Sequence, residues 1–283
     1  MMIWQCGKYN LDTGHRPLVM GILNVTPDSF SDGGRYLEPG AAVDRGLCLA
    51  EEGADIIDIG GESTRPGAKK VSPDEELKRV VPVIEGLAKR SNIPISIDTY
   101  KSEVARRSLE VGASIINDIS GLRFDPQMAG VAAKYKAGLV LMHIKGTPED
   151  MQKDPQYGDL LVEISDYLNG SIEIALEAGV ERAAIAIDPG IGFGKTVEHN
   201  LSLLKNLAHF KKIDCPIVAG ASRKSFIGKL NNGIPADERL PGSLAAALLA
   251  VQGGADIVRC HDVKETVQAL NTYWALANFN IST

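Results

Sequence analysis

The sequence predicts a (β/α)8 barrel, or TIM barrel, preceded by a short N-terminal hairpin. Eight apolar segments alternate with segments of helical periodicity, which is typical of parallel strands joined by crossover helices. Eight units in 283 residues average about 35 residues each, the size expected of the repeat in such barrels. Polar residues also end nearly every apolar segment, and this end of the strands is where barrels carry their functional sites.

The bulk properties of the chain restrict its class. Its length and its 44% hydrophobic content suit one domain spanning residues 1–283, although periodicity alone leaves an open, doubly wound sheet as the alternative fold. The net charge of −6 argues against nucleic acid or an anionic membrane surface as a partner. No signal-peptide pattern and no apolar run near the roughly 20 residues of a membrane span is present. Four scattered cysteines favour a cytoplasmic protein with reduced thiols over a disulfide framework or a zinc site.

The predicted elements follow one another in a regular order. Residues 3–6 and 8–11 flank Gly7 and predict the hairpin. Ser72 and Pro73 predict the start of one helix, because serine can cap a helix and proline suits its first turn. Strands are expected at 18–24, 54–60, 94–98, 113–119, 138–143, 184–188, 216–221 and 256–261. Helices are clearest at 41–53, 73–90, 101–111, 160–179, 197–209, 240–253 and 262–277, with stops expected at Gly112, Gly138, Gly179 and Gly254.

Polar side chains stand where the predicted strands end. One such residue could simply cap a helix or form a turn, but a set that spans the eight strands predicts a polar pocket at the C-terminal face of the barrel. Three long segments, 26–40, 61–73 and 145–159, follow strand ends and could fold over this pocket as lids or binding loops. The polar strand ends are Asn24, Asp58, Asp98, Asn117, Asp118, His143, Asp188, Ser222, Arg259 and His261.

Two of these strand ends are carboxylates that follow very apolar strands, Asp98 and Asp188. A buried carboxylate needs a partner. Binding of an amino-heterocycle or acid–base catalysis would supply one, and so would a structural ion pair or a helix cap. The sequence alone leaves these alternatives open.

Positive charge gathers at the same face. Arg65, Lys224, Arg259 and His261 favour an anionic substrate such as a phosphate or diphosphate ester, unless Arg259 and His261 instead pair with the acids. Asn24 and Asp32 could add oxygen ligands for a magnesium ion held by a diphosphate. A phosphate loop is excluded, because GIGFGKT has Pro189 where that motif needs its first glycine.

Eight longer motifs occur in order along nearly the whole chain, and together they resemble the dihydropteroate synthase family. Motifs of this length and number are highly specific. They are GILNVTPDSFSDGG (21–34), DIGGESTRPG (58–67), SIDTYKSEVA (96–105), INDISG (116–121), LMHIKGTPEDMQ (141–152), IDPGIGFGK (187–195), GASRKSFIG (220–228) and VRCHDV (258–263).

The resemblance implies a (β/α)8 barrel that joins 6-hydroxymethyl-7,8-dihydropterin diphosphate to p-aminobenzoate with magnesium, giving 7,8-dihydropteroate and diphosphate in folate biosynthesis. It also implies a homodimer that sulfonamides inhibit. Asp98, Asn117, Asp188 and Lys224 would hold the pterin, with Met142 and Phe193 lining its slot. Asn24, Arg65, Arg259 and His261 would hold the diphosphate, with Asn24 also on magnesium and Thr64 nearby. Phe30, Pro66 and Ser225 would shape the p-aminobenzoate site, and Asp32 would reach the metal when the first loop closes.

The catalytic set implied by the resemblance is Asp98, Lys224, Arg259 and His261. A pterin-binding methyltransferase domain that works with a corrinoid protein is the alternative function, but it would not need TPDSFSDGG or the Arg259–His261 end. A catalytically dead barrel should have lost some of these residues, and all are present. Cys260 should point away from the pocket, because side chains alternate along a strand.

Overall fold

The computed structural model describes residues 2–26, 39–64, 67–68 and 70–279. Four residues of the predicted site, Phe30, Asp32, Arg65 and Pro66, lie outside the described residues. The parts of the segments 26–40 and 61–73 that the structure describes still carry Thr26, Ser63 and Thr64 into the site.

The main sheet of the described chain has eight parallel strands in the order β8-β7-β6-β5-β4-β3-β10-β9. A parallel bridge between Ile187 and Ile217 joins its two ends, and the Ile187 N–H donates to the Pro216 carbonyl oxygen at 2.9 Å. The sheet therefore closes into the predicted barrel, and the open-sheet alternative is wrong. The strands are β3 (Leu18–Asn24), β4 (Ile56–Gly60), β5 (Ile95–Asp98), β6 (Ile115–Asp118), β7 (Gly138–Met142), β8 (Ile185–Asp188), β9 (Val218–Ala219) and β10 (Ile257–Cys260).

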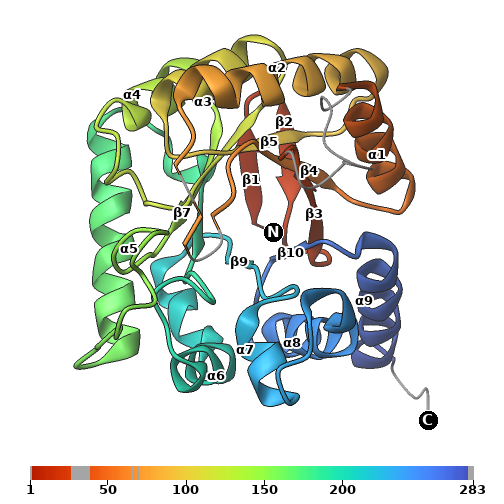
Figure 1. Cartoon of the computed structure of the whole chain (residues 1–283), viewed down its shortest axis with the longest axis vertical. Coiled ribbons are helices and arrows are strands. Elements are labelled where there is room, and N and C mark those ends of the chain that lie inside the picture. The colour runs from red at the N-terminus through yellow and green to blue at the C-terminus, as the bar shows by residue number, and fades with distance from the viewer. Residues whose placement is uncertain (1, 27–38, 65–66, 69, 280–283) are drawn as a thin grey trace.

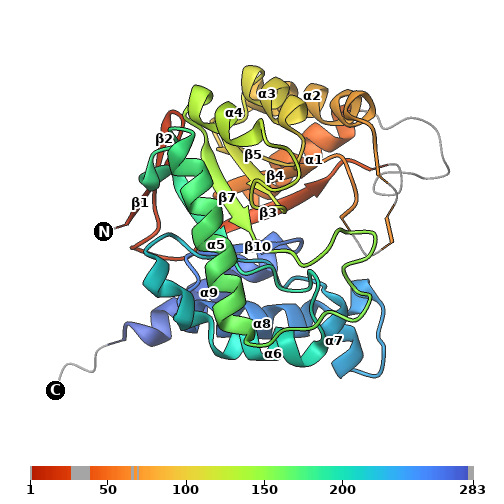
Figure 2. The same cartoon turned by 90° about the vertical axis from the view of Figure 1, so that its left-hand side faces the viewer.

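Helices surround the strands on the outside (Figures 1 and 2). They are α1 (Pro39–Glu51), α2 (Pro73–Arg90), α3 (Ser102–Glu110), α4 (Met128–Tyr135), α5 (Leu160–Glu177), α6 (Val197–Lys205), α7 (Ser225–Leu230), α8 (Leu240–Gln252) and α9 (Val263–Ala277). The predicted start of α2 is confirmed, since the Ser72 hydroxyl accepts from the Glu75 N–H at 3.2 Å and Pro73 follows it. Within the described ranges, every helix is too short or too polar to cross a membrane.

Two helices of the structure, α4 and α7, are not among the helices predicted from the sequence. The sequence of α4, MAGVAAKY, is short and rich in small residues, and α7 has only six residues. Such segments give a weak periodic signal, because amphipathicity needs several turns to show. Helix α4 ends at Lys136, which takes the left-handed conformation with φ of 51°.

Alternation along the strands separates two apolar layers. Outward-facing residues such as Ile57 and Ile97 pack in the core beneath the helices. Inward-facing residues such as Ile56 and Ile115 form a smaller cluster inside the barrel. The next inward positions on these two strands are polar, Asp58 and Asn117. The barrel interior therefore changes from apolar to polar toward the C-terminal ends of the strands.

The N-terminal hairpin, β1 (Ile3–Cys6) paired with β2 (Tyr9–Asp12), packs on the inner apolar cluster. It lies at the end of the barrel away from α7 (Figure 2). Trp4 is fully buried, and its Nε1 donates to the Ala184 carbonyl oxygen at 2.8 Å. The prediction that Gly138 stops a helix is wrong: Gly138 begins β7, and a Cβ there would lie 2.4 Å from Cys6 Sγ. This glycine makes room for the hairpin.

Replacing Trp4 by Ala is expected to lower the free energy of unfolding by about 3–5 kcal/mol, because it leaves a large cavity in the inner core. Chemical denaturation would measure the loss. Trp274→Ala is the matched control, because Trp274 is 36% exposed on α9. Equal losses in the two variants would contradict the packing role given to the hairpin.

Candidate active site

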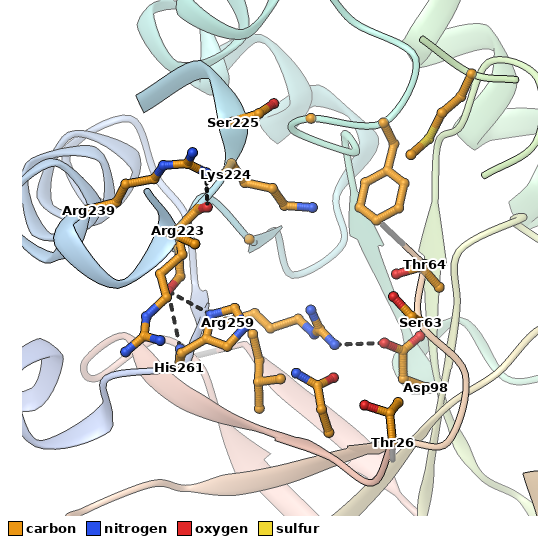
Figure 3. A pocket seen from close by; sticks show the side chains of 18 of the residues that line it. Thr26, Ser63, Thr64, Asp98, Arg223, Lys224, Ser225, Arg239, Arg259 and His261 are labelled. Atoms are coloured by element: carbon orange, nitrogen blue, oxygen red, sulfur yellow. Dashed lines mark hydrogen bonds and ion pairs between the residues drawn. The ribbon is translucent and has the colours of Figure 1, made fainter. Parts of the chain in front are cut away.

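A cavity of about 540 Å³ opens at the C-terminal ends of the strands, where the sequence predicted a pocket (Figure 3). Residues from β3, β5, β10 and the loops after β4, β8 and β9 line it. Strand register explains the grouping, because Asn24 pairs with Gly60, Gly60 with Asp98, and Asp98 with Asn117 at one level of the barrel. Of the predicted site residues, the lining includes Asn24, Thr64, Asp98, Phe193, Lys224, Ser225, Arg259 and His261.

Arg259 is the central cation of the cavity floor. Its Nε donates to Asp58 Oδ2 at 2.6 Å, and its Nη2 donates to Asp98 Oδ2 at 2.7 Å. Figure 3 shows the guanidinium directed at Asp98 across the pocket. The ion-pair interpretation of the acids therefore holds for Asp98, and it coexists with a place in the pocket lining.

Asp98 keeps one oxygen for a ligand. Its Oδ1 is buried and makes no hydrogen bond to any described residue. Burial raises the pKa of Asp98 to about 7, and the positive charges of Arg259 and Lys224 oppose this rise. The negative charges of Asp58 and Glu76 add to it. A carboxylate with an unsatisfied buried oxygen needs a donor, and a ligand in the cavity can supply it.

Asp188 ends strand β8, and a backbone N–H of the loop that follows holds its carboxylate. Its Oδ1 accepts from the Gly190 N–H at 2.7 Å. Gly190 has φ of +73°, and a Cβ there would lie 1.9 Å from the His143 carbonyl oxygen, so the turn requires glycine. Burial raises the pKa of Asp188, while the Gly190 N–H and Lys224 lower it.

Lys224 extends from the loop after β9 over the ring of Phe193, with Nζ 3.8 Å from the ring centroid. Burial and the charge of Arg259 lower the pKa of Lys224 to about 8. The preceding residue, Arg223, takes a left-handed conformation with φ of 57°, which is uncommon for a residue with a side chain. Its carbonyl oxygen accepts from Arg239 Nη1 at 3.0 Å, and its guanidinium pairs with Asp262. These contacts fix the turn that delivers Lys224 to the pocket.

His261 is neutral and oriented by Ser222. The Ser222 hydroxyl lies 3.0 Å from His261 Nδ1, and it also accepts from the His261 backbone N–H at 3.2 Å. Burial and the charge of Arg259 lower the pKa of His261 to about 3. Because the hydroxyl already accepts the backbone N–H, we assign its own proton to Nδ1, which leaves Nε2–H as a donor for a ligand. The alternative in which His261 pairs with the acids is not what the structure shows.

The remaining predicted residues are placed around this cavity. Asn117 and Met142 are buried beside it, and Met142 packs in an apolar cluster with Phe193 and Met151. Cys260 lies in the outer core, as expected from strand alternation.

Sequence reasoning missed several residues that shape the site. Lys195 is buried, with Nζ 2.9 Å from His143 Nδ1 and donating to the Phe193 carbonyl oxygen at 2.9 Å. Burial lowers the pKa of Lys195 well below its ordinary value and that of His143 to about 2. The motif containing Lys195 contributed to the family resemblance and was excluded as a phosphate loop, but neither interpretation gave Lys195 a role of its own. Arg79, Arg223 and Arg239 also line the cavity, and their positions depend on loop geometry that periodicity does not reveal.

The chain matches known proteins over most of its length. A family model described as pterin binding enzyme matches residues 20–261. A dihydropteroate synthase of Escherichia coli is 50% identical over 261 residues, which is 92% of each chain. A dihydropteroate synthase of Synechocystis is 48% identical over 262 residues, covering 93% of this chain and 91% of that protein.

Solved structures agree with these relatives. The Xanthomonas albilineans dihydropteroate synthase with 4-aminobenzoic acid is 45% identical, with a TM-score of 0.92 over 98% of this chain and 99% of that one. The same enzyme in complex with 7,8-dihydropteroate gives a TM-score of 0.88 at 42% identity, over 98% of this chain and all of that one. The Yersinia pestis enzyme in a sulfonamide drug complex gives 0.93 at 45% identity, with coverage of 98% and 100%. The chain therefore belongs to the dihydropteroate synthase family of pterin-binding enzymes.

Proposed function

We propose that this chain condenses 6-hydroxymethyl-7,8-dihydropterin diphosphate with p-aminobenzoate to give 7,8-dihydropteroate and diphosphate, the dihydropteroate synthase step of folate biosynthesis. The observation that carries the proposal is the Arg259–Asp98 pair on the cavity floor, because it sets a hydrogen-bonding carboxylate beside a cluster of cations. A pterin diphosphate needs both, because its polar heterocyclic edge requires hydrogen-bonding groups and its diphosphate requires positive charges.

The pterin ring fits the acidic side of the cavity. The amino-pyrimidine edge of a dihydropterin presents N–H donors, and the free Oδ1 of Asp98 can accept one of them. The side-chain carbonyl of Asn117, on the neighbouring strand β6, and Asp188, at the end of β8, add acceptors. Phe193 and Met142 form the apolar wall against which the ring would stack. A site built of such groups discriminates strongly against ligands that lack the matching donors.

The diphosphate fits the cationic side. Arg259 supplies guanidinium donors, and His261 supplies a neutral Nε2–H. The described residues contain no cluster of three acidic, histidine or cysteine side chains that could hold a metal ion by themselves. The carbonyl oxygen of Asn24, which lines the cavity, suits a magnesium ion carried mainly by phosphate and water oxygens. When bound, magnesium would supply charge neutralisation to the departing diphosphate.

The proposed chemistry is a dissociative displacement at the pterin methylene. The C–O bond to diphosphate breaks first, and Arg259, His261 and Lys224 offset the negative charge that develops on the leaving group. Positive charge then spreads from the methylene into the ring, where ionised Asp98 stabilises it. The arylamine nitrogen of p-aminobenzoate forms the new C–N bond and loses a proton. We propose that Ser225 helps to hold p-aminobenzoate, and that sulfonamides occupy the same place.

Several expectations from the sequence stay predictions. These are the roles of the residues outside the described ranges, assembly as a homodimer, a cytoplasmic location and a single domain over residues 1–283.

The direct test is product formation from the pterin diphosphate and p-aminobenzoate, with magnesium and with a chelator. We expect dihydropteroate to appear with magnesium and its formation to fall at least roughly tenfold when the metal is removed, since diphosphate would then leave without its counter-ion. Absence of product in a protein that still binds pterin would refute the proposal. A corrinoid methyl-transfer assay would then test the alternative function.

A further inference from the structure

Asp58 is a fully buried carboxylate in the barrel interior. It stands on β4 in register with Ile22 and Ser96. Along the strands, this level is one inward-facing position before that of Asp98 and Asn117, and so it lies farther from the C-terminal face of the barrel. The hydrogen bonds of Asp58 go to two other side chains, Arg259 and Asn117, through which it can act on a ligand.

One oxygen of Asp58 receives hydrogen bonds from both sides of the site. Its Oδ2 accepts from Arg259 Nε at 2.6 Å and from Asn117 Nδ2 at 3.0 Å. The first contact fixes the plane of the guanidinium that faces the diphosphate. The second fixes the orientation of the Asn117 amide, because Nδ2 is committed to Asp58 and Oδ1 is left as an acceptor. A free amide would present either atom to the ring.

The arrangement is costly if its only purpose is stability. Asp58 brings a second negative charge next to Asp98, and its own Oδ1 has no hydrogen-bond partner among the described residues. An under-satisfied buried carboxylate destabilises a fold relative to an apolar side chain of similar size. Arg259 would already be compensated by Asp98 alone. The contacts of Asp58 therefore indicate a role in arranging the site and not in stabilising the core.

We propose that Asp58 is a positioning residue that orients Asn117 for the pterin and Arg259 for the diphosphate through one shared oxygen. The proposal rests on the proposed function for the identity of these two ligand groups. It predicts that the loss of this one carboxylate weakens two bindings that involve different parts of the substrate, while a change at Asn117 weakens only one of them.

The test compares Asp58→Leu, Asn117→Ala and Asp55→Asn. Asp55 is a matched control on the chain just before β4, at the other end of the barrel, where it pairs with Arg16 at 2.6 Å and accepts from the Val19 N–H at 2.8 Å. Calorimetry would measure the binding of 6-hydroxymethylpterin and, separately, of inorganic diphosphate with magnesium. Asp58→Leu, which keeps a similar size and removes the accepting oxygen, should weaken each by roughly ten- to a hundredfold. Asn117→Ala should weaken the pterin alone, and Asp55→Asn neither.

Steady-state kinetics adds a readout that a purely structural role would not move. Asp58→Leu should raise the KM for the pterin diphosphate while leaving the KM for p-aminobenzoate within about twofold, because the hydrogen bonds of Asp58 go to Arg259 and Asn117, which are assigned to the pterin diphosphate. If Asp58→Leu does not fold, Asp58→Ala removes the same oxygen with a smaller side chain and serves in its stead.

The possible outcomes separate the two proposals. A variant at Asp58 that matches Asp55→Asn for both ligands, or that loses only one of the two bindings, would overturn the positioning role. Failure of the unmodified protein to form dihydropteroate would instead overturn the proposed function, and the binding of pterin and diphosphate would still decide whether Asp58 couples Asn117 to Arg259.

Discussion

Asp98→Asn is expected to lower kcat by roughly 10²–10³-fold, because it removes the negative charge that stabilises the developing pterin cation. The amide keeps the size of the side chain and can still accept a hydrogen bond from Arg259, whose Nη2 donates to Asp98 Oδ2 at 2.7 Å in the unmodified protein. Binding of inorganic diphosphate should therefore stay within about threefold of the unmodified protein, since the lost group faces the ring and not the leaving group.

Asp118→Asn provides the control for a buried carboxylate on the same side of the barrel. Asp118 is fully buried, and its oxygens accept from the Ser120 and Leu122 N–H groups of its own turn. This variant should lose stability while keeping kcat. A kcat for Asp98→Asn within about threefold of the unmodified enzyme would rule out the electrostatic role given to Asp98.

The same carboxylate should set the acid side of the pH profile. Burial raises the pKa of Asp98 to about 7, against the opposing charges of Arg259 and Lys224 and with those of Asp58 and Glu76. Only the ionised form stabilises the cation, so kcat/KM for the pterin diphosphate should fall as the pH drops below about 7. Asp98→Asn should abolish this acid limb, which a pH series of kcat/KM on both proteins would show.

Sequence reasoning recovered the barrel because its signals are local and repeated. Apolar strands and amphipathic helices each carry a period that can be read without knowing the fold, and the start of α2 was visible in Ser72 and Pro73 alone. Short helices such as α4 gave no such signal. The prediction for Gly138 was wrong because the glycine is required by close packing against Cys6. Cys6 lies 132 positions earlier in the chain, so this contact cannot be predicted from local sequence.

Some of the site residues could be predicted from the sequence, and others could not. Residues at strand ends could be predicted, because the C-terminal ends of parallel strands converge at one face. Their pairing could not, and the sequence left open whether Arg259 faces a ligand or an acid; in the structure it pairs with Asp98 and also lines the cavity. Lys195 and Asp58 were overlooked or left without a role, because a buried partner such as His143 is recognised only from distances in space.

Arg259→Met is expected to produce the largest combined loss of activity and stability. Arg259 pairs with the buried carboxylates of both Asp58 and Asp98, and its removal leaves two like charges in a medium that solvates them poorly. Breaking a buried pair in this way typically costs about 3–5 kcal/mol in unfolding free energy. Loss of the guanidinium should also lower kcat/KM by at least roughly 10³-fold, because in the proposed mechanism it offsets the charge of the departing diphosphate.

Arg16→Met is the control, since Arg16 also pairs with an aspartate but is 45% exposed. Exposed pairs contribute up to about 1 kcal/mol, so this variant should lose little stability and no activity. Denaturation of the two variants at pH 8 would measure the difference. Equal losses would contradict the interpretation of Arg259 as the counter-charge of the cavity floor.

The pH dependence of this loss separates charge from packing. Burial already holds the pKa of Asp98 above that of the unfolded chain, and removal of Arg259 should raise it further. The folded variant then binds a proton at Asp98 more tightly than the unfolded chain does, so the contribution of Asp98 to stability is fully present below about pH 4 and is lost as the pH rises through the raised pKa. Unfolding free energies measured from pH 5 to 8 should therefore fall more steeply in Arg259→Met than in the unmodified protein. A loss that is constant over this range would mean that Arg259 stabilises the barrel by its packing, and that the two carboxylates do not depend on its charge.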